Sequence, residues 1–215
     1  MSNFNRSQHV YTSPDFDKIV REVISFLNST PVYQLPISEQ FYGTGVYVIY
    51  CMAISGIYSK FSTLNRGLLR FPIYVGKAVP KGWRQARQAT FGPVRGRELS
   101  NRLREHVRSI QLGEGLDLSD YFCRFVILEG KESDLIGTVE ATLIRQYQPL
   151  WNTLIDGFGN HDPGKGRYEQ AKSNWDVCHP GRAWAEKCQG IPTDKNALYK
   201  NIAEFLDNLD ATEEI

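Results

Sequence analysis

The chain has 215 residues, which suits one domain with additions and is short for two full domains. Its 41% hydrophobic and 12% aromatic content supports a substantial core and excludes a disordered chain. The longest apolar run, residues 46–52, is strand-sized and too short for a membrane span. The N-terminus lacks the apolar segment of a secretory signal, and the four cysteines form no CxxC pair. We therefore expect a soluble intracellular protein without a zinc site or a disulfide framework.

Positive charge is concentrated in one fifth of the chain. Residues 66–108 hold eleven basic side chains, nine of them arginine, against only Glu98 and Glu105. The overall net charge of +1 thus hides a segment of +9 and a remainder of −8. Such a segment favours contact with a polyanion, because arginine is the better partner for phosphate and guanine. The alternative is a solvated face whose arginines meet carboxylates elsewhere in the fold.

Sequence patterns predict a helix and two strands in the first half of the chain. Ser13 and Pro14 are typical of a helix start, and an apolar stripe at helical spacing covers residues 16–27. β-Branched and aromatic residues predict strands at 46–50 and 72–77. A polar insertion, residues 52–71, separates the strands, and a basic arm rich in glycine, arginine and glutamine follows at 81–97.

The second half continues the alternation of helices and strands. A basic helix is predicted at 97–111, an interior strand at 121–128, and a helix from a capping Ser133 to Tyr147. Residues 156–190 carry little regular pattern, and an amphipathic helix is predicted at 194–209.

This order of elements predicts an α+β protein with a small core and extensions. We assign residues 1–44 to an N-terminal helical extension and residues 45–155 to the core. Residues 156–215 form a C-terminal loop and helix extension of the same compact domain.

Glu140 is the first candidate for chemistry. It lies between Ile136 and Ile144 on the inward stripe of its helix. A carboxylate there costs free energy unless it is paired or binds a metal. An ion pair with Arg124 or Arg145 is the structural alternative to a metal site.

Arg102 and His106 lie one turn apart on one face of the basic helix. A guanidinium neutralises phosphate, and an imidazole moves protons near neutral pH. The alternative is a surface pair that points at water. Arg104 and Arg108 form a second pair on a different face, and spacing alone does not rank the two pairs.

Two short motifs favour the functional interpretation of these residues over the structural alternatives. Gly45-Val46-Tyr47 and Tyr74-Val75-Gly76 resemble the paired motifs of the GIY-YIG nuclease superfamily. Tyrosines in strands usually only pack, but the resemblance continues in order with Arg102 and His106, then Glu140, then Asn152 after Pro149. Valines replace the family's isoleucines, and the two motifs stand farther apart than is usual. An insertion such as 52–71 is typical of the restriction endonuclease branch.

The resemblance implies a small GIY-YIG core, a three-stranded and mainly antiparallel sheet flanked by helices. It implies a prokaryotic, cytoplasmic type II restriction endonuclease that hydrolyses double-stranded DNA at a short palindromic, GC-rich site, similar to enzymes that cut CCGCGG. It further implies one Mg²⁺ per active site, no nucleotide cofactor and no covalent intermediate. A homodimer would match a palindrome, with the N-terminal helix and the insertion as dimer surfaces.

The resemblance also assigns roles to residues. Glu140 would bind Mg²⁺ and Arg102 would hold the scissile phosphate. Tyr47 would be the general base, and its ionisation at pH 7 would cost about 4 kcal/mol unless nearby cations lowered its pKa, the candidates being Lys77, His106 and the metal ion.

The remaining catalytic candidates have supporting roles. His106 would alternatively orient Tyr47 or relay its proton. Tyr74 would position phosphate or water, and Asn152 would brace the site. The arm 81–97 and the loop 156–190 are candidates for groove contact. The predicted DNA-binding residues are Lys81, Arg84, Arg87, Arg95, Arg97, Arg104 and Arg108.

Three other functions remain open at this point. One is a GIY-YIG nuclease of a repair or homing type, although this chain has little room for the separate domain that such enzymes attach. A second is a non-catalytic DNA-binding module on the same core. A third is an α+β protein whose basic segment is only surface.

Overall fold

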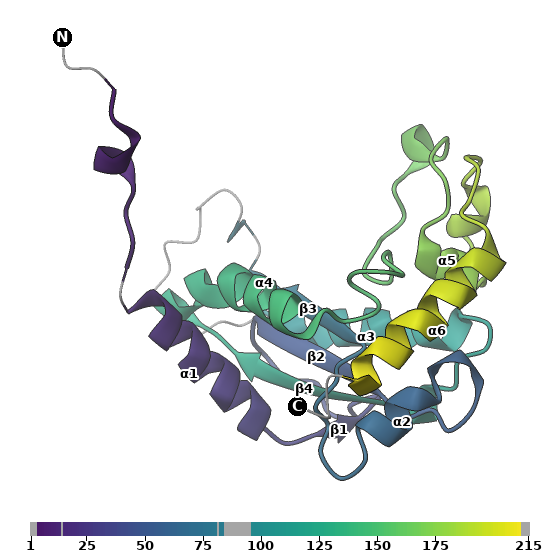
Figure 1. The fold of residues 1–215 in the computed structure, drawn as a ribbon, viewed down its shortest axis with the longest axis horizontal. Helices are drawn as coiled ribbons and strands as arrows, with labels where there is room; N and C mark the ends of the chain where they lie inside the picture. Colours follow the sequence, from purple (N-terminus) through teal and green to yellow (C-terminus); the bar gives the residue numbers. More distant parts are fainter. Residues whose placement is uncertain (1–3, 14, 81, 84–95, 212–215) are drawn as a thin grey trace.

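A four-stranded antiparallel sheet forms the centre of the computed structural model, which describes residues 4–13, 15–80, 82–83 and 96–211 (Figure 1). The strand order is β1-β4-β2-β3. The strands are β1 Tyr33–Gln34, β2 Gly45–Cys51, β3 Tyr74–Ala78 and β4 Tyr121–Ile127. The α+β class and the three expected strands are confirmed. The fourth strand, β1, was not predicted because two residues carry no alternating pattern; pairing with β4 defines it.

Helices surround the sheet. They are α1 Phe16–Ser29, α2 Lys60–Leu64, α3 Glu98–Leu112, α4 Ile136–Tyr147, α5 Asn174–Cys178 and α6 Lys195–Ala211. The described 3₁₀ helices are Arg6–His9, Gly56–Tyr58, Leu118–Asp120, Gly130–Leu135, Lys165–Arg167 and Ala185–Lys187. No helix in these described ranges is long and apolar enough to cross a membrane.

Two predicted helix starts are wrong. The N-cap of α1 is Asp15, not Ser13, and its side chain makes no capping hydrogen bond. Ser133 lies inside a 3₁₀ turn, where its hydroxyl donates to the carbonyl of Gly130 at 2.7 Å, and α4 begins at Ile136. Hydroxyl residues make local turn bonds as readily as caps, and sequence alone does not separate the two.

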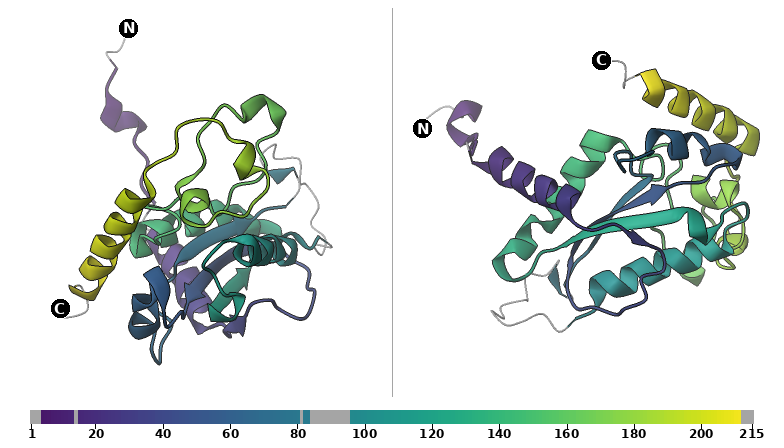
Figure 2. Two further views of the ribbon diagram at one scale, coloured as in Figure 1. Left: turned by 90° about the vertical axis from the view of Figure 1, so that its right-hand side faces the viewer. Right: turned by 90° about the horizontal axis from the view of Figure 1, so that it is seen from below.

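The helices cover both faces of the sheet. Alternate residues of β2 divide between two cores: Tyr47, Ile49 and Cys51 pack with α3, whereas Val46 and Val48 pack with α1 and α4. Figure 2 shows α3 and α4 on opposite sides of the sheet. All seven residues of β2 are buried, because this central strand is covered on both faces. Residues presented by β2 toward α3 therefore lie in a closed, low-dielectric layer.

The outer edge of β3 is held by the turn after α4. The Val75 N–H donates to Oδ1 of Asn152 at 2.7 Å, and the Asn152 Nδ2 donates to the Val75 carbonyl at 2.8 Å. The Trp151 N–H donates to the carbonyl of Ile73 at 2.9 Å. The Asn152 side chain thus binds both backbone hydrogen-bonding groups of Val75, as a neighbouring strand would. It thereby fixes the strand that carries Tyr74.

The C-terminal extension packs on the α3 side of the sheet. Phe158 and Trp175 are fully buried and share one core with Trp151 and residues of α3. Helix α6 contributes Leu198, Ile202 and Leu206 to the same core. The segment for which no regular pattern was predicted therefore contributes to the core shared with α3, and Figure 1 shows it beside α6 at one end of the sheet.

Candidate active site

A tyrosine and a histidine meet inside the layer between β2 and α3. The hydroxyl oxygen of Tyr47 lies 2.6 Å from Nε2 of His106, and both side chains are at most 1% exposed. Tyr74 from β3 completes an aromatic group, with ring centroids 6.2 Å from Tyr47 and 5.1 Å from His106. The apolar stripe of α3 faces the sheet and so turns His106 inward. Burial of His106 excludes the interpretation of this residue as a surface histidine.

Burial keeps both partners of this pair neutral. Burial raises the pKa of Tyr47 well above its ordinary value, and Arg102 is the cation that opposes the rise. Burial, followed by the charge of Arg102, lowers the pKa of His106 well below its ordinary value. His106 therefore cannot supply positive charge to Tyr47 in the free protein, contrary to the sequence-based expectation. Lys77 does not fill that place either, since its ammonium group binds Glu140.

Arg102 is fixed beside the tyrosines by groups from two segments. Its Nη1 donates to Oε2 of Glu105 at 2.7 Å and contacts Nε2 of His161 at 2.6 Å. Its Nη2 donates to the carbonyl of Gly159 at 2.6 Å. The side chain keeps 19% of its surface exposed, so an anion can reach a guanidinium whose direction is already set.

Lys77 and Glu140 form the second part of the site. Lys77 Nζ donates to Oε2 of Glu140 at 2.5 Å, with 35% and 18% of the side chains exposed. The alternative partners for Glu140 are engaged elsewhere: Arg124 donates to the carbonyl of Asn28, and Arg145 donates to Thr142. Glu140 is thus an ion-paired carboxylate that solvent still reaches.

The two parts lie on opposite faces of the edge strand β3. Tyr74 packs in the core on the α3 side of the strand. Lys77, three residues later, lies on the other face and binds Glu140 of α4. The parts influence each other electrostatically, because the charge of Glu140 contributes to the raised pKa of Tyr74 after the main effect of burial and the opposing effect of Arg102. A group bound at this strand edge is therefore within the influence of a fixed guanidinium, a neutral Tyr–His pair and a carboxylate.

Sequence reasoning named the loop 156–190 only as a candidate for groove contact and missed its contacts with the site residues. Phe158 stacks on His106 at 4.4 Å between ring centroids, and Gly159 and His161 both contact Arg102. A Cβ at Gly159 would lie 2.5 Å from the Tyr74 hydroxyl oxygen, so the backbone itself approaches the tyrosine closely. No residue pattern marks these contacts, which depend on how the C-terminal extension folds over α3.

A cleft of about 320 Å³ opens next to Arg102. It is lined by Arg102, Glu105, His106, Arg108, Ser109, Phe158, Asn160, His161, Asp162, Arg182 and Trp184. Of the predicted DNA-binding arginines, Arg108 is exposed and lies in this cleft with Arg102.

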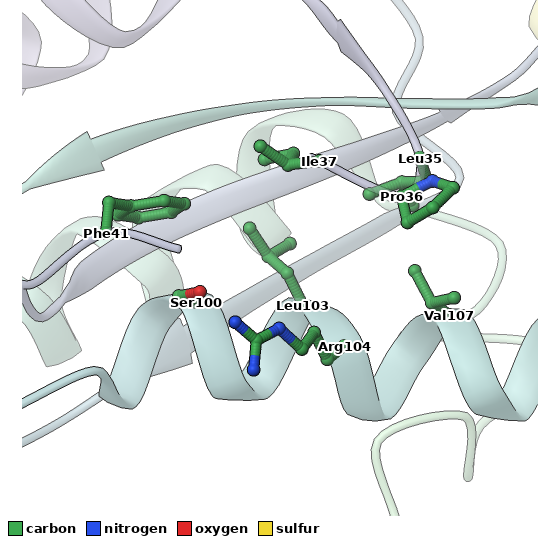
Figure 3. A pocket seen from close by; sticks show the side chains of 8 residues that line it. All are labelled: Leu35, Pro36, Ile37, Phe41, Ser100, Leu103, Arg104 and Val107. Atoms are coloured by element: carbon green, nitrogen blue, oxygen red, sulfur yellow. The ribbon is translucent and has the colours of Figure 1, made fainter. Parts of the chain in front are cut away.

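Two other predicted DNA-binding arginines, Arg97 and Arg104, do not line this cleft. Arg97 donates to Gln40 and stacks on Tyr42, with 5.1 Å from its guanidinium carbon to the ring centroid. Arg104 lines a small, mainly apolar pocket between α3 and residues 35–41 (Figure 3). Its Nη2 is buried and has no hydrogen-bond partner among the residues that the structure describes. The remaining four, Lys81, Arg84, Arg87 and Arg95, lie outside the described residues.

Comparison with protein-family models identifies the family of the chain. The family model of the Eco29kI GIY-YIG domain, a restriction endonuclease family, matches residues 39–206. The chain belongs to this family. The match runs from before β2 into α6, so it covers every residue of the candidate site described above. This GIY-YIG protein is accordingly a restriction-type nuclease, and its substrate class is DNA. A search of curated proteins found no match.

Proposed function

We propose that the protein is a type II restriction endonuclease that hydrolyses both strands of double-stranded DNA at a short palindromic site. The observation that carries this proposal is the neutral Tyr47–His106 pair beside Arg102, on one face of β3, with Glu140 on the other. These groups supply what phosphodiester hydrolysis requires: a proton acceptor, a cation for the phosphate and a carboxylate for a metal ion.

The donor set fits Mg²⁺. Among the described residues no group of three or more His, Cys, Asp or Glu side chains could cage a metal. Mg²⁺ does not need such a cage, because it keeps several waters and uses one or two carboxylates together with substrate phosphate. Glu140 offers such a carboxylate, 18% exposed. When bound, Mg²⁺ would offset negative charge on the phosphate and on the leaving oxygen.

The Tyr47–His106 pair suggests a route for the proton. A water molecule attacks phosphorus while its proton passes to the Tyr47 oxygen and the hydroxyl proton of Tyr47 passes to Nε2 of His106. The bond from phosphorus to the 3′ oxygen breaks, and that oxygen takes a proton from solvent, so the products are a 5′ phosphate and a 3′ hydroxyl. This relay avoids a free phenolate, which burial disfavours. No covalent enzyme intermediate forms.

The other site residues have supporting roles in this proposal. Arg102 binds the scissile phosphate, and the Tyr74 hydroxyl, which lies close to Gly159, positions phosphate or the attacking water. Asn152 acts through β3, whose edge it binds at Val75. Lys77 holds Glu140 in place before substrate binds.

Symmetry supports the proposed homodimer and palindrome, and the arginine-rich segment supports a GC-rich target. One active site per chain cuts two strands most simply as a two-fold homodimer on a palindrome. A GC-rich target such as CCGCGG suits an arginine-rich segment, since arginine bonds bidentately to guanine. The family membership favours this restriction activity over a repair or homing role and over a non-catalytic DNA-binding module.

Incubation of the purified protein with plasmid DNA tests the proposal. Mg²⁺ should give discrete fragments that EDTA abolishes, and sequencing of the fragment ends should yield one palindrome. Structure-dependent nicking would indicate a repair nuclease. Retention of DNA without any cutting would leave only a binding module and would overturn the proposal.

A further inference from the structure

Arg182 is a buried arginine with an unusually complete set of contacts. It is 4% exposed, and its Nε and Nη2 donate to the two carboxylate oxygens of Asp176, each at 2.7 Å. Its guanidinium carbon lies 4.5 Å from the ring centroid of Trp175 and 4.7 Å from that of Trp184. Asp176 also accepts from the hydroxyl of Ser173 at 2.6 Å. This geometry leaves Arg182 one orientation.

The same guanidinium holds the backbone of a short segment. Nη2 donates to the Gly157 carbonyl at 2.9 Å, and Nη1 donates to the carbonyls of Phe158 and Asn160 at 3.1 and 3.3 Å. Loop carbonyls in a dry environment need partners, and three of them converge here on one side chain. The segment 157–160 is thereby fixed by Arg182 rather than by regular secondary structure.

Segment 157–160 contacts three candidate catalytic residues, which are His106 and Arg102 of α3 and Tyr74 of β3. The Phe158 ring stacks on His106 with 18° between the planes and meets Tyr74 edge-on at 4.9 Å. The Gly159 carbonyl accepts from Arg102, and the Gly159 Cα lies so close to Tyr74 that a methyl group there would lie 2.5 Å from its hydroxyl oxygen. A shift of the segment would therefore move Arg102, His106 and Tyr74 together.

We propose that Arg182 is a positioning residue: paired with Asp176, it fixes segment 157–160, and that segment aligns Arg102 and His106 for phosphodiester hydrolysis. The inference rests on the proposed function and deepens it. Arginine is required because its planar fork serves the carboxylate and the carbonyls at once, which a lysine ammonium cannot do.

Arg182→Lys tests the proposal, because it keeps the charge and removes the fork. We expect the single-turnover cleavage rate to fall about 30-fold to 100-fold, as misplacement of reacting groups by about 1 Å does. DNA affinity, measured by fluorescence anisotropy in EDTA, should stay within about threefold, because electrostatic contact with phosphate is retained. The matched control is Lys200→Gln on the exposed surface of α6, which should cleave as the wild type does.

A spectroscopic measurement separates positioning from loss of folded protein. The His106 ring protons lie over Phe158, so in NMR their resonances are shifted by the stacked ring; in Arg182→Lys they should move while the thermal unfolding midpoint still shows a folded protein. Gly159→Ala leaves Arg182 unchanged but places a methyl group against the Tyr74 hydroxyl, and it should give the same loss of cleavage rate. This variant replaces Arg182→Lys in the test if Arg182→Lys does not fold.

The outcomes are distinct. Wild-type cleavage by Arg182→Lys, or by Gly159→Ala in the case of a misfolded Arg182→Lys, overturns the inference. A loss of rate equal to the loss of folded protein, with unmoved His106 resonances, overturns it too. Failure of the wild-type protein to cut in the same assay instead removes the proposed function, and the inference falls with it.

Discussion

Tyr47 and Gly76 face each other across the β2–β3 ladder, and the Tyr47 hydroxyl occupies the space that a side chain at position 76 would need. A Cβ there would overlap this oxygen and lie 2.8 Å from the Tyr74 ring. Glycine at the end of the Tyr74-Val75-Gly76 motif is thus required by space. The motif lets one tyrosine lie flat over the neighbouring strand and reach His106.

Gly76→Ala should displace Tyr47 and cost about 1–3 kcal/mol of stability, as overpacking does. We expect the single-turnover cleavage rate to fall by about 100-fold, because the proton acceptor moves. Denaturant unfolding and rapid-quench cleavage measure the two effects. The matched control is Gly137→Ala in α4, whose added Cβ makes only ordinary contacts with Trp83. Equal cleavage by both variants would contradict the spatial explanation.

Tyr47→Phe and His106→Gln should each lower the cleavage rate by about 10²-fold to 10⁴-fold, the range of general acid–base catalysis. If the two side chains act as one relay, the double variant should be hardly slower than the single ones. Single-turnover rates on one oligonucleotide give the comparison. Multiplicative losses would show that the residues act independently.

The relay also predicts a pH dependence. Only neutral His106 accepts a proton, and burial lowers its pKa well below 6.5, so His106 stays neutral to lower pH than an ordinary histidine. The acidic limb of kcat/KM should therefore lie below pH 6.5 and vanish in His106→Gln. An acidic limb at or above pH 6.5 would argue against His106 as the acceptor.

Glu105→Gln should tighten DNA binding. Glu105 holds Nη1 of Arg102 at 2.7 Å, the group proposed to bind phosphate, so its negative charge competes with DNA. Removing the charge should lower Kd by roughly fivefold, the scale of an exposed ion pair of about 1 kcal/mol. Glu204→Gln on α6 makes the same change of charge far from the site and should leave Kd unchanged. Weaker binding by Glu105→Gln would indicate that Glu105 orients Arg102 instead.

Stability should fall in mild acid because of His179. This buried residue bonds to the Tyr58 hydroxyl at 2.6 Å, and burial lowers its pKa from 6.5 to about 4. Between these values the unfolded chain binds a proton at His179 that the folded chain does not, so His179 alone contributes a decrease of about 3 kcal/mol in the free energy of unfolding as pH falls from 6.5 to 4.

Urea unfolding at several pH values measures this slope. In His179→Gln the slope over this range should be smaller, even though the variant is less stable overall. His9→Gln, on the exposed N-terminal 3₁₀ helix, is the control and should keep the wild-type slope. An unchanged slope in His179→Gln would exclude this histidine as its source.

Local patterns were enough to predict most of the central elements. The stripes of α3, α4 and α6 and the β-branched runs of β2 and β4 are long, so periodicity marks them within a few residues. The sequence left open whether His106 faces the sheet or water, and its burial in the structure decides for the sheet. These elements bring Tyr47, Tyr74, Arg102 and His106 together, which the ordered motifs anticipated.

Contacts between distant segments could not be predicted in this way. The partner of Glu140 is Lys77 rather than an arginine, because α4 packs beside the edge strand β3, and no local pattern shows that packing. Phe158, Gly159 and Arg182 lie in a segment of irregular backbone whose conformation is set by side-chain hydrogen bonds. Their positions follow from tertiary structure alone.

Cleavage by Glu140→Gln tests the central claim most directly, because Glu140 is the single carboxylate to which the metal is assigned. On an oligonucleotide that contains the palindrome, the variant should bind within about threefold of the wild type, since only one charge changes. With Mg²⁺ it should cut at least about 10³-fold more slowly, as loss of metal-assisted charge stabilisation of several kcal/mol implies. Glu204→Gln should cut normally. Metal-dependent cutting by Glu140→Gln at the wild-type rate would contradict the account of this site.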